Sequence, residues 1–185
     1  GSILEHVQFN FIIDNCSRVL THELCRHRVG TAFSQTSGRY CRLDAIDLVF
    51  DPILEPVRSD IEQLVNYVED MYEHMSHKLG LVTETNFNVK KKLTSALRRI
   101  APNGQSNQMA FSANLRTLRH TIMLRTARHA EWEIRNVFAQ IYRLVKEKAP
   151  LFFYDAKEAV VDGELEITGM KTQPFEAEAV VPTTN

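Results

Sequence analysis

The sequence predicts an α+β domain. Residues 7–13 alternate polar and apolar side chains, which is the period of a strand with one buried face. Residues 56–79 and 129–148 instead place apolar side chains at helical spacing. Because strand and helix patterns do not alternate regularly along the chain, we expect an α+β arrangement and not repeated βαβ units.

The first half of the chain predicts one strand, two helices and a loop. Asp14 and Asn15 can cap a helix from Cys16 to about Arg28. Residues 29–42 contain glycines, serines and threonines, so we expect a loop with short extended pieces. The amphipathic helix of residues 56–79 ends where Gly80 follows it.

The second half predicts three further helices and a short strand. A helix is expected from Asn88 to about Ile100, and a strand over residues 108–112. Residues 114–125 and 129–148 follow as two helical segments. Beyond Pro150 the chain is acidic and is expected to be irregular, with weak alternation near residues 164–167.

The composition favours one globular domain that acts on a small ligand. The chain has 185 residues, enough for one domain with its own core, and a formal net charge of −1. Its basic residues gather in segments 18–42 and 90–128. A near-neutral chain with basic segments fits a small phosphorylated ligand, whereas nucleic-acid binding is disfavoured without a net positive field.

The sequence predicts a cytoplasmic protein. No apolar run approaches the roughly 20 residues that span a bilayer, and residues 1–5 lack the features of a signal peptide. The cysteines, Cys16, Cys25 and Cys41, are an odd and sparse set. They fit a reducing compartment better than a disulfide framework.

The strongest candidate for ligand chemistry is the segment from Arg26 to Tyr40. Arg26-His27-Arg28 is a dense cationic triplet, and Ser34 to Tyr40 adds hydroxyls, a glycine and another arginine. Such groups hold a phosphate by charge-assisted hydrogen bonds. The alternative, which the triplet alone leaves open, is a solvated helix end whose cations favour the helix dipole.

Residues 114–125 form the second candidate segment. On a helical wheel Arg116 and His120 lie about 40° apart, whereas Arg125 lies about 180° from Arg116. One helix could therefore serve two ligands, or two sites in an oligomer, from opposite faces. A basic helix with solvated arginines remains the alternative.

Metal and cysteine chemistry are not predicted. His22 and His27 are five residues apart, whereas a zinc-protease helix requires a spacing of four. Cys25 and Cys41 have no base at a diagnostic spacing, so neither is expected to be a nucleophile. The Gly-rich dinucleotide and P-loop patterns are also missing from the sequence.

Four separated segments together resemble the flavin-dependent thymidylate synthases, the ThyX family. Arg26-His27-Arg28 followed by Ser37-Gly38-Arg39-Tyr40 is similar to the family signature. Residues 4–9 resemble the strand entry before the signature, and residues 98–102 resemble an Arg-x-x-x-Pro segment. Residues 114–135 are similar to the family's C-terminal helix pair. The resemblance covers about residues 2–150.

The resemblance implies a fold and a reaction. It implies a mixed antiparallel sheet with packed helices, in a homotetramer whose active sites lie between subunits. It implies that dUMP is methylated to dTMP, with 5,10-methylenetetrahydrofolate as carbon donor and NADPH-reduced FAD as hydride source. Residues 1–150 would form the synthase domain, and residues 151–185 an acidic C-terminal tail or extension of it.

The resemblance also implies roles for individual residues. Arg125 would be catalytic, because its cation would favour the N3-deprotonated uracil and so activate C5. FAD would be bound by Ser2, Glu5, Arg26, His27, Arg28, Asn114, Leu115, Arg116 and His120. The nucleotide dUMP would be bound by Glu23, Arg26, Gln35, Thr36, Ser37, Gly38, Arg39, Arg98 and Arg125. No metal is implied.

The sequence departs from the family pattern at three places. Gln35 stands where many members have Glu, and a neutral amide cannot carry charge or act as a base. The family pattern starts with a segment that this sequence does not show ahead of Gly1, so either the sequence starts late or the protein is a shortened form. The acidic tail carries no motif that we can assign.

Two other classes of function stay open at this point. A flavin- or nucleotide-binding relative without synthase activity would keep the binding motifs and lack turnover. An RNA-binding protein would use the basic segments, although these lack the interleaved aromatic residues on which bases stack.

Overall fold

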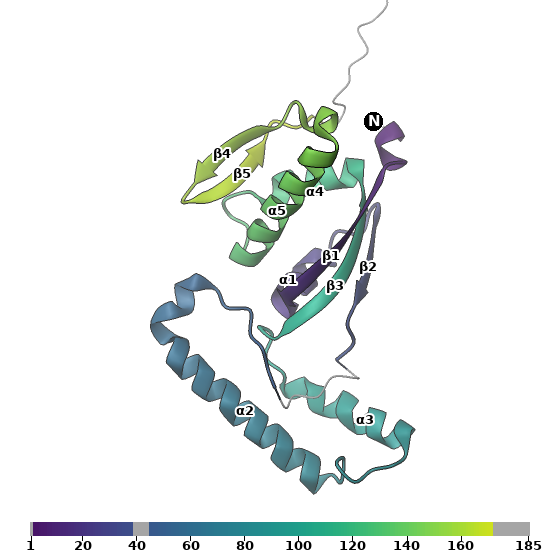
Figure 1. Cartoon of the computed structure of the whole chain (residues 1–185), viewed down its shortest axis with the longest axis vertical. Coiled ribbons are helices and arrows are strands. Elements are labelled where there is room, and N and C mark those ends of the chain that lie inside the picture. Colours follow the sequence, from purple (N-terminus) through teal and green to yellow (C-terminus); the bar gives the residue numbers. More distant parts are fainter. Residues whose placement is uncertain (1, 39–44, 172–185) are drawn as a thin grey trace, which may run out of the picture. The chain divides into compact units, whose positions relative to one another are not determined.

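The computed structural model describes residues 2–38 and 45–171, which fall into two compact units (Figure 1). Among the described residues, unit 1 draws on residues 2–10, 27–32 and 112–171, and unit 2 on residues 11–26, 33–38 and 45–111. Helices and strands are both present without regular alternation, so the predicted α+β class is confirmed.

Three strands form one sheet in the order β1, β3, β2, so β3 is the central strand. The bounds are Gln8–Ser17 for β1, Thr31–Gln35 for β2 and Ser106–Asn114 for β3. The strand predicted at residues 108–112 is therefore confirmed and is longer than expected. The extended piece predicted within residues 29–42 is β2.

An aromatic layer joins the three strands. Phe111 of β3 is fully buried, and its ring stacks at 5.9 Å from Phe11 of β1 and at 5.5 Å from Phe33 of β2, measured between ring centroids. Met109 and Ala113 are also fully buried, so every second residue of β3 points into the core.

The first helix, α1 (Arg18–Leu24), is shorter than predicted, and Asp14 and Asn15 do not cap it. Both belong to β1. The chain stays in the sheet because Cys16 is buried and its Sγ donates to the carbonyl of Asn107 at 3.3 Å. Ser17 is the actual cap, and its Oγ accepts a hydrogen bond from the amide of Leu20 at 3.1 Å.

Two helices complete unit 2, α2 (Arg58–Lys78) and α3 (Phe87–Leu97), and both were predicted with different ends. The turn before α2 is a 3-10 helix, Pro52–Val57, and a second short one, Arg98–Ile100, follows α3. Tyr72 of α2 and Leu97 of α3 share a buried cluster with Ile46 and Leu81. This cluster holds the two helices together.

Unit 1 contains α4 (Leu115–Arg125) and α5 (Trp132–Lys148), close to the two predicted segments. It also contains the 3-10 helices Ser2–Glu5 and Pro150–Phe153. Helix α5 starts later than predicted because the Glu131 carboxylate accepts from the amides of Glu133 and Ile134 and so caps it there.

The prediction of irregular chain beyond Pro150 is wrong for residues 157–168, although the weak alternation noted near residues 164–167 does fall in a strand. Strands β4 (Lys157–Val161) and β5 (Glu164–Thr168) form an antiparallel hairpin that packs against α4 and α5 (Figure 1). Its turn is Asp162-Gly163, with φ angles of 56° and 83° that suit an Asp-Gly pair. Ile167 is fully buried, and its amide donates to Thr126 Oγ1 of α4's C-cap at 3.0 Å.

Within the described residues, no helix has both the length and the apolar character needed to cross a membrane.

A buried ion pair ties α4 to the chain on both sides of the hairpin. Arg119, whose side chain is 3% exposed, donates to the Asp155 carboxylate at 2.7 Å and to the carbonyl oxygens of Phe152 and Lys171. Asp155 Oδ2 also accepts from the amide of Lys171. Burial alone would raise the pKa of Asp155, but the hydrogen bonds from Arg119 and Lys171 outweigh it and hold that pKa below its ordinary value.

Replacing Asp155 with Ala should lower the free energy of unfolding by about 3–5 kcal/mol, because the guanidinium of Arg119 would stay buried without its counter-charge. Denaturant unfolding at pH 7 measures this. Since the pKa of Asp155 is lowered on folding, its ionised form adds stability above about pH 3.9, and this is lost as the pH falls through the lowered pKa. The advantage of the native protein over Asp155→Asn should therefore disappear in acid. Equal stabilities at pH 7 would contradict the assignment.

Candidate functional site

A turn formed by residues 27–30 packs on the first turn of α4 in unit 1. The carbonyl of Gly30 accepts from the amide of Asn114 at 2.9 Å, and the carbonyl of Val29 accepts from Thr117 Oγ1 at 2.8 Å. Gly30 has a φ of 68°, and a Cβ there would lie 2.2 Å from Asn114 Nδ2. Only glycine fits this position.

Asn114 itself is the N-cap of α4. Its Oδ1 accepts from the amide of Thr117 at 2.9 Å, and the residue is buried. Asn114 therefore joins the turn to the helix, because its amide donates to the turn and its side chain caps the helix.

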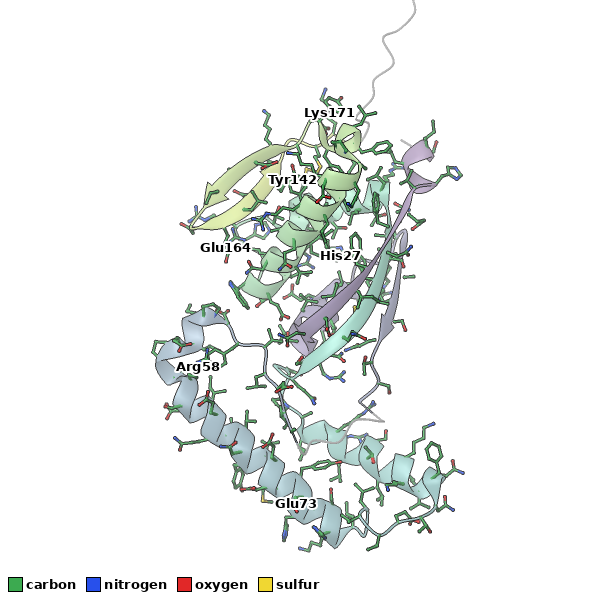
Figure 2. The ribbon with its side chains drawn as sticks, in the orientation of Figure 1. His27, Arg58, Glu73, Tyr142, Glu164 and Lys171 are labelled. Carbon is green, nitrogen blue, oxygen red and sulfur yellow. The ribbon has the colours of Figure 1, made fainter. Side chains whose placement is uncertain are left out.

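His27 lies in this turn and is half-buried (Figure 2). Its side chain is hydrogen-bonded to Arg125, the last residue of α4. Arg125 Nε donates to His27 Nε2 at 2.7 Å. Burial lowers the pKa of His27, and the charges of Arg125 and His120 lower it further. Because Nε2 accepts, the imidazole is in its neutral form. The triplet that looks fully cationic in the sequence is thus two arginines around a neutral histidine.

The other predicted flavin residues of unit 1 differ in exposure. Ser2 and Glu5 are exposed in the N-terminal 3-10 helix, and Glu5 Oε1 accepts from Arg116 at 2.5 Å. Arg28, Arg116 and His120 are exposed, and the last two are neighbours one turn apart on α4.

Leu115 differs from the rest of the predicted flavin set because its side chain is fully buried in the core. Its amide donates to the carbonyl of Val7 at 2.8 Å. Any ligand contact at this position would therefore have to involve main-chain atoms.

In unit 2, Gln35 ends β2 and is joined to α1 through two hydrogen bonds in series. Gln35 Nε2 donates to Thr21 Oγ1 at 3.1 Å, and Thr21 Oγ1 donates to the carbonyl of Arg18 at 3.1 Å. Thr21 is fully buried. A glutamate at position 35 can only accept, so it could not replace the amide donor in this chain of bonds.

The segment after β2 brings two arginines together. The amide of Thr36 donates to the carbonyl of Gln108, which keeps the chain beside β3. Ser37 and Gly38 are half-buried. A Cβ on Gly38 would lie 3.0 Å from a terminal nitrogen of Arg18 and 3.9 Å from Cδ of Arg98, so both arginine side chains border this glycine.

Arg18 is a candidate that the motif match does not include. It is the first residue of α1, and its amide donates to the carbonyl of Asn103 at 3.0 Å. Its membership of the basic segment 18–42 was the only signal in the sequence, because its approach to Gly38 depends on where α1 begins.

The predicted residues divide between the two units. Of the described flavin residues, all but Arg26 lie in unit 1, and of the described nucleotide residues, all but Arg125 lie in unit 2. Glu23 is half-buried in α1, and Arg26 is exposed just after it. Arg39 lies outside the described residues.

Across residues 2–38 and 45–171, no group of three or more His, Cys, Asp or Glu side chains is placed to hold a metal ion.

A protein-family model described as thymidylate synthase complementing protein matches residues 1–151. The chain belongs to this family. All four segments of the resemblance fall within the residues matched. Among curated members, the flavin-dependent thymidylate synthase of Corynebacterium diphtheriae is 33% identical over 181 residues, covering 94% of this chain and 70% of that protein.

Other members of the family are similarly close. The flavin-dependent thymidylate synthase of Clostridium tetani is 29% identical, covering 88% of this chain and 68% of that protein. A crystal structure of the Helicobacter pylori enzyme ThyX, complexed with FAD and dUMP, superposes with a TM-score of 0.63 at 24% identity. It covers 83% of this chain and 75% of that chain, and it supports the family fold.

Replacing Gln35 with Glu should lower the free energy of unfolding by about 1 kcal/mol at neutral pH, because Thr21 Oγ1 would lose its donor and its hydroxyl would have to turn from Arg18. Thermal and urea unfolding measure the effect. In a Thr21→Val background, Gln35→Glu should lower the free energy of unfolding much less, because the hydroxyl is already missing. Equal costs in the two backgrounds would show that the amide does not act through Thr21.

Proposed function

We propose that the chain is a flavin-dependent thymidylate synthase, which methylates dUMP to dTMP with 5,10-methylenetetrahydrofolate as carbon donor and NADPH as the source of reducing equivalents. The family match over residues 1–151 carries this proposal. Curated members of which this chain covers about two thirds or more carry that name. They favour a synthase over a relative that only binds flavin or nucleotide.

The donor chemistry of unit 1 fits FAD. Arg28, Arg116 and His120 are exposed, and the first two are cations that can bind the pyrophosphate of a dinucleotide. The turn of residues 27–30 packs against the first turn of α4, so the backbone that carries Arg28 is held beside α4. When bound and reduced, FAD supplies the hydride of the reaction. The proposed flavin set is completed by Ser2, Glu5, Arg26, His27, Asn114 and Leu115, with Leu115 acting through its main chain.

The donor chemistry of unit 2 fits the phosphate of dUMP. Ser37 offers a hydroxyl and Gly38 an amide without a side chain. Arg98 offers a guanidinium on a side chain whose Cδ borders that glycine. We add Arg18, whose guanidinium borders Gly38. Charge-assisted hydrogen bonds of this kind are the strong ones for phosphate. The proposed nucleotide set is completed by Glu23, Arg26, Gln35, Thr36, Arg39 and Arg125.

Arg125 is the proposed catalytic residue. A guanidinium beside the uracil favours its N3-deprotonated form, because an opposite charge lowers the pKa of a nearby acid. The deprotonated ring is the better nucleophile at C5. The methylene carbon of the folate then bonds to C5 while one of its bonds to a folate nitrogen breaks and leaves the electron pair on that nitrogen, and the C5 hydrogen leaves as a proton.

We further propose a homotetramer with active sites between subunits, and a cytoplasmic location. The location is supported by chemistry, because Cys16 and Cys25 are thiols and the reaction consumes a reduced nicotinamide. Dependence of activity on protein concentration, alongside light scattering, tests the assembly.

The native protein should purify with flavin absorbance and should release tritium from C5-labelled dUMP when NADPH and methylenetetrahydrofolate are present. Arg125→Ala should reduce release to background while leaving FAD bound, because the uracil would lose its counter-charge. Arg128→Ala is the matched control. The side chain of Arg128 is exposed, and its Nε forms just a long ion pair of 3.9 Å with Asp162 Oδ2, which is also exposed. If the native protein binds flavin but releases no tritium, the alternative of a relative that only binds flavin or nucleotide is favoured. If Arg125→Ala releases tritium at the normal rate, Arg125 does not have the catalytic role assigned to it.

Replacing Arg18 with Ala should weaken dUMP binding by about 10- to 100-fold, the usual range for a lost hydrogen bond to a charged group. Titration calorimetry measures this. Deoxyuridine, which lacks the phosphate, should bind the variant and the native protein equally. Arg99→Ala is the control, because Arg99 donates to the carbonyls of Ser95 and Ala96 in the last turn of α3. A loss of the same size for deoxyuridine would rule out a phosphate contact.

A further inference from the structure

The contact between His27 and Arg125 has a defined direction and uses a defined atom. Arg125 donates through Nε, the guanidinium nitrogen nearest to its own chain, and His27 accepts through Nε2 at 2.7 Å. A guanidinium has five N–H donors in one plane, and this bond uses one of them. The bond restrains the orientation of the guanidinium plane through Nε, and the orientation of this plane decides how the group can meet a planar ligand.

We propose that His27 is a positioning residue for the reaction, which aims the guanidinium of Arg125 at the uracil by accepting the Nε hydrogen bond. The proposal rests on the proposed function, because it takes Arg125 to be the group that contacts the pyrimidine. It goes beyond a role for His27 in binding flavin alone. In this arrangement a residue of the turn controls the group that activates the nucleotide.

His27 is itself held firmly enough to position another residue. Its carbonyl accepts a hydrogen bond from Thr31 Oγ1, so its backbone is fixed at the start of β2. Gly30, three residues later, holds the turn against α4. Arg125 approaches from the far end of the same helix. The histidine therefore joins the start of α4, through the turn, to its end.

The bond requires a neutral imidazole. The charged groups acting on His27 are Arg125 and His120 from α4, and Arg26 and Arg28 are its sequence neighbours. Burial lowers the pKa of His27, and the charges of Arg125 and His120 lower it further, so all three disfavour a proton on the imidazole. Protonation would turn Nε2 from an acceptor into a donor facing another donor. Positioning should therefore be complete above about pH 6.5 and should be lost as the pH falls through the lowered pKa of His27.

Two amide substitutions provide a matched test. The side-chain oxygen of glutamine can reach the place of Nε2, whereas asparagine is one methylene shorter and cannot. With FAD added to saturation, His27→Asn should weaken dUMP binding and lower the rate of tritium release by about 10- to 100-fold. His27→Gln should stay within about threefold of the native enzyme. If both variants lose FAD and regain full activity when FAD is added, His27 is a flavin ligand only and the proposal is overturned.

The pH dependence gives a second readout, which a purely structural role would not change. The dUMP dissociation constant of the native enzyme should rise as the pH is lowered below about 6.5, partly because the phosphate of dUMP also titrates there. The ratio of native to His27→Gln constants cancels that contribution. This ratio should grow in acid, since glutamine cannot be protonated in this range. A ratio that does not change with pH overturns the proposal.

A double-mutant cycle on dUMP affinity separates positioning from direct contact. In an Arg125→Ala background, His27→Asn should not weaken dUMP binding further, because the guanidinium that His27 positions is missing. Additive losses would mean that His27 contacts the ligand by itself, and would overturn the proposal. If the native protein neither binds dUMP nor releases tritium, the proposed function fails; if it does both but the cycle is additive, only this inference fails.

Discussion

The close contact between the turn of residues 27–30 and the first turn of α4 is the constraint on which the candidate site in unit 1 depends. Gly30 makes it possible, because its φ is left-handed and a Cβ at this position would lie 2.2 Å from the Asn114 side chain, which excludes any other residue. Asn114 caps the helix and donates its amide to the turn, and Thr117 adds a third bond. These bonds fix His27 and Arg28 relative to Arg116, His120 and Arg125.

The two units arrange their charged side chains differently around the candidate site residues. In unit 1 a histidine is kept neutral among basic neighbours, and so it can act as an acceptor for one of them. In unit 2 two arginines border a glycine without a side chain, which suits a small anion. The neutral amide of Gln35 adds no negative charge to that basic region. The family's reaction needs both kinds of site, one for a large cofactor and one for a nucleotide monophosphate.

Local patterns in the sequence predicted most helices and strands. Residues 58–78, 115–125 and 132–148 follow the helical period, and capping residues account for small differences at their ends. The hairpin beyond Pro150 was missed because β4 is almost entirely exposed and shows no clear apolar alternation, although residues 164–167 alternate weakly and Asp162-Gly163 is a turn signal. The motif match supplied the site residues, but the neutral state of His27, the burial of Leu115 and the approach of Arg18 to Gly38 depend on tertiary contacts that no local pattern encodes.

The bonds from Gln35 through Thr21 to the Arg18 carbonyl have a consequence for the exchange of acid and amide at position 35. A threonine hydroxyl can accept from an amide or donate to an acid, so position 21 tolerates either residue at position 35. The two cases differ in what happens to the Arg18 carbonyl, because the hydroxyl donates to it only while position 35 is the donor. The exchange of an acid for an amide at this site therefore changes the internal hydrogen bonding of α1 as well as the charge at the end of β2.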